Sequence, residues 1–190
     1  MVDKTSSVIK EDEQQLIQLI VFRAGHEEFC VPIDAVQEII KVSHVTPIPN
    51  APDFMRGLIN VRGDIVAIIN VNVRFNLMDN IIEECKHIII TKQASGLFGL
   101  MVNEVLEVLR VKKNDINETP SSMIKIHEQY VKGVVIYEDR MIVLLDLSNV
   151  LSPTELVKLS EVAYQYKKKT DSVNELEVNE ILPKKKRKEL

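Results

Sequence analysis

The sequence predicts a mainly β protein that consists of two small five-stranded barrels, with short helices and a C-terminal helix. Its apolar residues fall mostly into short runs rich in β-branched side chains and bounded by turn residues, a pattern typical of strands. In residues 54–71 two such runs flank Arg62-Gly63-Asp64, where Gly63 tolerates the positive φ of a tight turn. We interpret these residues as a β-hairpin.

Two stretches of the chain recur further along it, which indicates an internal duplication. Residues 130–133 match residues 54–57 at a displacement of about 76 positions, and the second hairpin turns at Glu138-Asp139-Arg140. Residues 97–108 match residues 28–39 at a displacement of about 69 positions. Each unit of about 70 residues would hold about five strands and bury its apolar face by closing into a barrel. Two packed barrels would leave a groove at their seam.

The remaining elements of the first unit follow from local signals. Residues 16–22 and 29–33 are apolar runs that form a hairpin around Gly25-His26-Glu27. Residues 34–42 alternate as a strand does, after a short helical turn that Asp34 could cap. Prolines 47, 49 and 52 make residues 46–52 an extended loop, because each proline removes an amide donor. A short turn or helix at 72–78 and a polar connector at 81–86 lead to a strand that starts at 88–91.

The last part of the chain has the signals of a helix. In Ser152-Pro153-Thr154-Glu155 a capping serine precedes proline at the first helical position and glutamate three places after the cap. Apolar residues then recur at helical spacing and predict a stripe that packs on a barrel. These are Leu156, Leu159, Ala163 and Tyr166.

The ends of the chain are polar and set the expected domain boundaries. We expect a flexible leader at 1–14, one domain of two barrel subdomains sharing a core at 15–160, and the end of the C-terminal helix with a disordered tail at 161–190. Residues 184–188 are all basic. A solvated tail is the simplest interpretation, and an electrostatic contact with an anionic surface or a nuclear-import signal is the alternative.

Composition and motif content argue against catalysis, metal binding and membrane insertion. The net charge is −4, and we find neither a signal peptide nor an apolar run of transmembrane length, so we expect a soluble intracellular protein. The four histidines lack metal-ligand spacing, and nucleophile, phosphate-loop and dinucleotide motifs are missing. We therefore expect no catalytic residue, no metal and no cofactor. Cys30 and Cys85 are expected to be buried free thiols, with a disulfide as the alternative.

Polar residues within the apolar hairpin suggest a binding surface. Asn60 and Arg62 are either ordinary solvated residues or part of a specialised turn, since the second copy has Glu138 in the place of Arg62. Val36 and Val105 occupy equivalent places in the two units, where they face the seam or belong to the core. An apolar groove rimmed by charges would suit an amphipathic helix from another protein.

The motifs at residues 29–63 resemble those of one family. F-x-V-x-I-D-x-V-x-E-I at 29–39, the proline loop, and P-x-F-x-x-G-x-I-N-x-R-G at 52–63 are similar to the CheW family of bacterial chemotaxis coupling proteins. The resemblance covers roughly residues 15–159. It implies two intertwined, SH3-like, five-stranded barrels without catalytic activity. Such proteins join transmembrane chemoreceptors to the histidine kinase CheA, so the implied location is cytoplasmic, at the inner face of the membrane in receptor arrays.

The resemblance also implies where the partners bind. The cytoplasmic hairpin tip of the receptor would occupy the groove between the barrels, and the regulatory domain of CheA would bind a barrel end for which no residues are assigned. Ala67 stands where the family often has proline, and the basic extension beyond about Tyr166 lies outside the common pattern. The implied receptor-binding residues are Ile20, Ile33, Val36, Glu38, Arg62, Val105 and Leu106.

Two other interpretations fit parts of the sequence. The chain could serve as a CheW-like adaptor in a different signalling array, such as one for motility or surface sensing. It could also be a small β-barrel nucleic-acid-binding protein that uses its basic tail, although few aromatic residues and an acidic body count against this. We therefore expect no nucleic-acid partner, and retardation of DNA or RNA by the protein at about 0.15 M salt would contradict that expectation.

Overall fold

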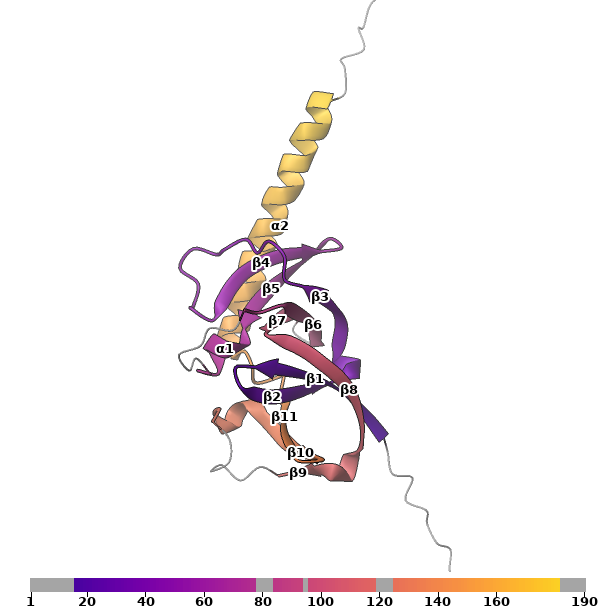
Figure 1. Ribbon diagram of the computed structural model, residues 1–190. Coiled ribbons are helices and arrows are strands. Elements are labelled where there is room, and N and C mark those ends of the chain that lie inside the picture. The colour runs from indigo at the N-terminus through magenta and orange to yellow at the C-terminus, as the bar shows by residue number, and fades with distance from the viewer. Residues whose placement is uncertain (1–15, 78–83, 94–95, 119–124, 182–190) are drawn as a thin grey trace, which may run out of the picture.

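The computed structural model of the protein describes residues 16–77, 84–93, 96–118 and 125–181. The leader expected at 1–14 and the basic run at 184–188 lie outside these residues. In the described part the strands form two sheets, which Figure 1 shows one above the other. The mainly β fold that the sequence predicts is therefore confirmed.

Each sheet closes into a small barrel. Barrel A has the strand order β8-β1-β2-β11-β10-β9, and barrel B has the order β3-β6-β7-β5-β4. Barrel A thus has six strands instead of five, because the two-residue β9 joins it. Barrel A consists of β1 (Leu16–Ala24), β2 (Glu27–Pro32), β8 (Glu104–Lys112), β9 (Ile116–Asn117), β10 (Val131–Tyr137) and β11 (Arg140–Leu145). Barrel B consists of β3 (Val36–Lys41), β4 (Met55–Val61), β5 (Asp64–Asn70), β6 (His87–Gln93) and β7 (Gly96–Val102).

The two duplicated units exchange hairpins, so neither unit forms a barrel alone. Hairpin β1–β2 of the first unit pairs with β8 and β11 of the second, while β6–β7 of the second unit pairs with β3 and β5 of the first. This corrects the expectation of one barrel per unit and agrees with the intertwined barrels that the family resemblance implies. The parallel registers repeat as well: Phe29 lies opposite Val143, and Phe98 lies opposite Ala67.

Closure of both barrels depends on a glycine in the strand that receives the closing segment. In barrel B, Thr46 exchanges two backbone hydrogen bonds with Leu58, at 2.9 and 2.8 Å. A Cβ at Gly57 would lie 2.7 Å from the Thr46 carbonyl carbon. In barrel A, Asn117 of β9 pairs with β10, and a Cβ at Gly133 would lie 2.9 Å from the Asn117 carbonyl oxygen. Only glycine lets the two backbones approach this closely.

Buried side chains form one shared core and one smaller core in each barrel. Alternate residues of β1 point to different cores, since Leu19 and Val21 belong to barrel A while Ile20 and Phe22 belong to the shared core. The core of barrel A consists of Leu19, Val21, Cys30, Leu109, Val111, Val135, Ile142 and Leu144. The core of barrel B consists of Ile59, Val61, Val66, Ile68, Ile88, Ile90 and Met101. Strands between the barrels are thus buried on both faces, which is why their apolar runs are nearly continuous.

The C-terminal helix α2 (Pro153–Ile181) begins where the capping signal predicts and ends at Ile181, within the stretch 161–190 where its end was expected. The Ser152 amide donates to the Glu155 carboxylate at 2.7 Å, and the Glu155 amide donates to the Ser152 hydroxyl at 3.3 Å. Leu159 is buried, and Leu156 and Tyr166 pack against the shared core, so the predicted apolar stripe is confirmed. Figure 1 shows α2 running past barrel B and projecting beyond it.

Arg74 joins this helix to both barrels. Its guanidinium donates two hydrogen bonds to the Glu155 carboxylate, each at 3.1 Å, and Nε donates to the Val150 carbonyl at 2.8 Å. The same group stacks over Phe54, 4.3 Å from the ring centre, and over Tyr130 at 5.3 Å. Arg74 ends the helix α1 (Val71–Arg74), which the sequence places at 72–78.

The short helical turns and the cysteines complete the description. The 3-10 turns are η1 (Ile33–Ala35), η2 (Lys113–Asp115) and η4 (Glu128–Tyr130). Both cysteines are free thiols, Cys30 is buried as expected, and Cys85 is only half-buried. None of the helices in the described residues combines the length and apolar content that a membrane crossing needs.

Candidate functional site

The β4–β5 hairpin ends in a two-residue turn that presents Arg62 to solvent. Val61 pairs with Asp64, so the loop consists of Arg62 and Gly63, whose φ angles are +53° and +96°. Two positive φ angles match the right-handed twist of the hairpin. The Asn60 side chain accepts a hydrogen bond from the Gly63 amide at 2.8 Å. Asn60 therefore has a local structural role in holding the turn.

The turn contacts strand β3 through an ion pair. Arg62 Nη2 lies 3.1 Å from Glu38 Oε2, and the two side chains are 81% and 20% exposed. In the part of the chain that the structure describes, Glu38 is the ion-pair partner of Arg62. An exposed pair of this kind contributes only about 0–1 kcal/mol to stability, so the guanidinium can turn toward a partner protein at low cost.

The second unit contains a corresponding ion pair built differently. Glu107 of β8 occupies the place of Glu38, and Arg140 contacts it at 2.7 Å and Glu28 at 3.2 Å. The Arg140 side chain is 33% exposed and lies 5.5 Å from the Tyr137 ring centre. The hydrogen bond with Glu107 raises the pKa of Arg140 further, which keeps it a cation. Sequence reasoning placed Arg140 only in a turn, whereas the structure begins β11 with it.

The two arginines therefore differ in how far their charge is already matched. Arg140 joins two carboxylates within barrel A, while Arg62 has one carboxylate and an exposed guanidinium with five N–H donors in total. The sequence did hold a signal for Arg140. It lies two positions after Glu138, the residue that replaces Arg62 in the second copy, and Glu107 repeats Glu38. Of the two turns, that of barrel B is the better suited to bind a partner.

The predicted apolar residues that precede Glu38 in the chain lie on η1 and β3. Ile33 is 37% exposed, and Val36 is half-buried with its inner side against the shared core. Ile39 and Val42 are also exposed along this segment, and sequence reasoning did not assign them to the site. The structure thus pairs Glu38 with Arg62 and places Val36 two residues before Glu38 on β3, while Ile33 lies on η1, before the strand begins.

The other three predicted residues lie elsewhere. Ile20 is 3% exposed within the shared core, where it supports β1 instead of forming a surface. Val105 and Leu106 are half-buried on β8 and pack against different cores. The Val105 amide donates to the His87 side chain at 3.4 Å, and Val36 pairs with Thr91. His87 and Thr91 are four residues apart on β6, which is about 13 Å at 3.3 Å per residue. The seven residues therefore do not line a single groove.

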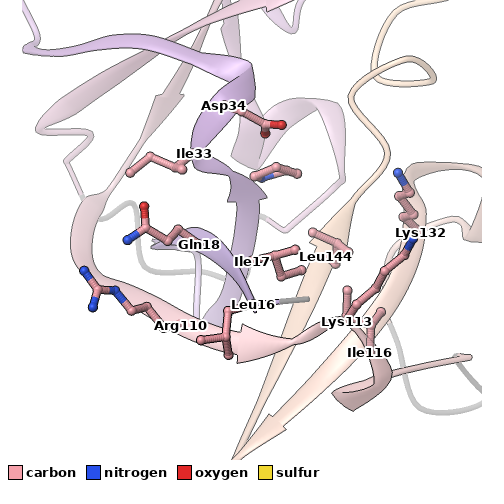
Figure 2. A pocket seen from close by; sticks show the side chains of 11 residues that line it. Leu16, Ile17, Gln18, Ile33, Asp34, Arg110, Lys113, Ile116, Lys132 and Leu144 are labelled. Carbon is pink, nitrogen blue, oxygen red and sulfur yellow. The ribbon is translucent and has the colours of Figure 1, made fainter. Parts of the chain in front are cut away.

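A separate cavity of about 700 Å³ lies at one end of barrel A (Figure 2). Its volume falls within the usual range of ligand pockets, about 300–1,000 Å³. Ile33 is the member of the predicted set that lines it, and sequence reasoning missed the cavity because its walls come from four distant parts of the chain. The cavity is lined by Leu16, Ile17, Gln18, Pro32, Ile33, Asp34, Arg110, Lys113, Ile116, Lys132 and Leu144.

The described residues hold neither a metal-binding cluster nor an activated thiol. They contain no group of three His, Cys, Asp or Glu side chains placed to hold a metal ion. Burial raises the pKa of the Cys30 thiol to about 12, which keeps it protonated and unreactive at neutral pH. Burial also raises the pKa of Cys85. Neither thiol has the lowered pKa of a nucleophile.

Comparison with known proteins gives one consistent family. The sequence model of the CheW-like domain matches residues 18–155. The chain is 37% identical to the chemotaxis protein CheW of Rhizobium meliloti over 139 residues, which covers 73% of this chain and 89% of the relative. It is 32% identical to that of Treponema pallidum over 155 residues, 80% of this chain and 90% of the relative. The crystal structure of the scaffolding protein TtCheW from Thermoanaerobacter tengcongensis matches at a TM-score of 0.67 and 28% identity, covering 75% of this chain and 92% of that chain.

Proposed function

The chain belongs to the CheW-like family of chemotaxis scaffold proteins, and on that basis we propose that it couples transmembrane chemoreceptors to the histidine kinase CheA. In this role it catalyses no reaction and binds both partners at once. It works in the cytoplasm, at the inner face of the membrane, where it is recruited by the receptors without inserting into the bilayer.

The proposed receptor site is centred on Glu38 and Arg62 of barrel B and extends along the chain through Val36 to Ile33. A helical receptor tip presents apolar residues at intervals of three or four positions with charged residues beside them. The half-buried apolar residues would contact the apolar stripe, and the exposed Arg62 guanidinium would bind a carboxylate next to it. The observation that carries this proposal is the contrast between exposed Arg62 and doubly paired Arg140.

We place the CheA contact at an end of one barrel, away from Arg62, and assign no residues to it. Separate surfaces are needed because the receptor and the kinase must bind simultaneously. Val105 and Leu106 of β8 would form a separate contact with the receptor on barrel A, outside the surface around Arg62, with Ile20 supporting β1 from the core.

The test is co-sedimentation of the protein with receptor-containing membranes and CheA, scored by kinase activation. Arg62→Ala should weaken receptor association about fivefold or more, as expected when a contact worth more than about 1 kcal/mol is lost. Its fold should be intact, because the Arg62–Glu38 pair contributes little to stability. Arg56→Ala is the matched control, since Arg56 is exposed on the same hairpin.

Two outcomes would count against the proposal, for different reasons. Equal binding by the Arg62→Ala and Arg56→Ala variants would show that the turn does not contact the receptor. Failure of the unmodified protein to raise kinase activity with any receptor-containing membrane would contradict the coupling role itself.

A further inference from the structure

The cavity at the end of barrel A is lined by cations whose charge the described residues do not neutralise. Arg110 of β8, Lys113 of η2 and Lys132 of β10 line it, and all three are exposed. None of them has an ion-pair partner within the described ranges. Asp34 is the single carboxylate among the lining residues, so three cations against one anion leave two positive charges in excess. This wall therefore attracts an anion.

The remaining walls of the cavity are mainly apolar. Leu16 and Ile33 line it and are 63% and 37% exposed. Ile17 and Ile116 are half-buried and pack against the core of barrel A, to which Leu144 belongs. An apolar body in the cavity would remove these side chains from water, which is favourable. The cavity thus matches a ligand that has an apolar part and an anionic part.

We propose that the cavity binds an amphipathic organic anion, in which a compact apolar body carries one phosphate or similarly strong anionic group. Figure 2 shows the side chains of Lys113 and Lys132 on the same side of the cavity, with Leu16 and Ile17 nearby. The anionic group accepts charge-assisted hydrogen bonds from the two lysines, and the apolar body covers Leu16 and Ile17. A round cavity of about 700 Å³ is about 11 Å across, which accommodates an eight-carbon chain of about 9 Å.

Both parts of the ligand are needed for binding. The lysines are exposed, so a small inorganic anion competes with water and salt for them and gains little. A neutral apolar molecule covers the walls but leaves the cations unmatched. Two sources can supply the combined chemistry, namely a soluble organic phosphate and the head group of an anionic lipid.

Titration of the full chain with octyl phosphate, kept below its micelle concentration and followed by methyl NMR, tests the proposal. The methyl signals of Ile17, Ile116 and Leu144 report on the cavity. Those of Ile39 and Ile136, which are 40% and 57% exposed elsewhere, report on non-specific binding to apolar surface. We expect saturable shifts of the cavity signals with a dissociation constant of about 1 mM or lower, the range for a ligand of about thirteen non-hydrogen atoms, and no shift of the other two. No saturable shift of the cavity signals, or equal shifts at all five residues, would overturn the proposal.

Related probes and charge-reversal variants test the two parts of the ligand separately. Octyl glucoside, which keeps the chain without the charge, and inorganic phosphate should each bind at least about tenfold more weakly than octyl phosphate. Lys113→Glu with Lys132→Glu should weaken octyl phosphate binding by a similar factor. Lys41→Glu with Lys92→Glu reverses two exposed lysines of barrel B and should leave it unchanged. Circular dichroism melting of each variant checks that it is folded. Equal binding of octyl glucoside and octyl phosphate, or unchanged affinity after Lys113 and Lys132 are reversed, would contradict the proposed charge contact.

Sedimentation with vesicles distinguishes the two sources of the ligand. The vesicles contain phosphatidylglycerol and phosphatidylcholine, and the comparison is between the unmodified protein and the Lys113→Glu, Lys132→Glu variant. The basic run at 184–188 is the same in both, so a difference between them reports on the cavity. Vesicle binding that the variant loses identifies a lipid head group, whereas octyl phosphate binding without such a difference identifies a soluble anion. No receptor or kinase is present, so the result is independent of the proposed coupling role.

Discussion

Replacing Gly57 with alanine is expected to open barrel B. A Cβ at this position would lie 2.7 Å from the Thr46 carbonyl carbon and 3.0 Å from Pro47 Cα, where the backbone φ is +140°. All of these neighbours are backbone atoms, which cannot rotate away as a side chain can. Moving them to ordinary contact distance separates Thr46 from Leu58 and breaks the two hydrogen bonds that close the barrel.

The expected loss of stability is the sum of two effects. Forcing an alanine into a positive-φ conformation costs about 1–2 kcal/mol. Losing two backbone hydrogen bonds costs about 1–3 kcal/mol more. The free energy of unfolding should therefore fall by about 2–5 kcal/mol, a large fraction of the 5–15 kcal/mol that is usual for a domain. In urea, with a slope of about 2 kcal/mol/M, the midpoint should fall by about 1–2.5 M.

Two other glycines provide matched controls. Gly63 has a φ of +96° but open space around its Cβ position, so Gly63→Ala should shift the urea midpoint by only about 0.5–1 M. At Gly133 a Cβ would meet the Ile116 Cγ2 methyl at 2.7 Å, which can move, and the Asn117 carbonyl oxygen at 2.9 Å, which cannot, and Gly133 is not among the positive-φ glycines, so Gly133→Ala should be intermediate. Far-UV circular dichroism in urea measures all three. A Gly57→Ala midpoint equal to that of Gly63→Ala would refute the argument that backbone collision dominates.

Three further predictions concern the helix start, the cysteines and the proposed receptor surface. Burial favours the protonated form of Glu155, but hydrogen bonds from Ser152 and the charge of Arg74 outweigh it and lower the pKa below 4.5. The ionised Glu155 therefore stabilises the folded protein above pH 4.5, and this stabilisation is lost as the pH falls through the pKa of Glu155 in the folded state. Thermal unfolding should show that the unmodified protein is more stable than the Glu155→Gln variant, by a difference that shrinks as the pH is lowered. A difference that grows on acidification would contradict this sign. Iodoacetamide at pH 8 should label Cys85 in the native protein and Cys30 only after unfolding, because Cys30 is buried and its pKa is about 12; labelling at equal rates would show that Cys30 is accessible. Val36→Gln should weaken receptor association by about 1–3 kcal/mol if that contact is dry, and an unchanged affinity in the co-sedimentation assay would remove Val36 from the site.

Local features of the fold could be predicted from the sequence. The two-residue turn at Arg62 and Gly63, the helix start at Ser152, and the 3-10 turn before β3 all depend on residues within a few positions of each other. The duplication was also visible, and the equivalent parallel registers of Phe29 and Phe98 confirm it. The sequence placed the end of α2 only somewhere within 161–190, because a polar composition at 170–181 neither requires nor prevents a helix.

The candidate site was predictable only in part. The pair of Glu38 and Arg62 follows from opposite charges on a strand and a neighbouring turn, and the structure joins them at 3.1 Å. The burial of Ile20 and the role of Arg140 were missed, because both depend on which strands are neighbours in space. Alternation shows that successive residues of β1 face opposite sides, but not which side is covered by the second barrel.

The sequence by itself determined the strand pattern, the duplication, the tight turns and the start of the C-terminal helix, since these depend on short-range preferences of the backbone and on the period of apolar residues. Only the tertiary structure decided that the two units exchange hairpins, that Arg140 binds two carboxylates, and that a cationic cavity forms at the end of barrel A. The physical reason is that strands of similar composition can pair in several ways at similar local free energy. Burial of the shared core, contributed by residues far apart in the chain, selects among those pairings.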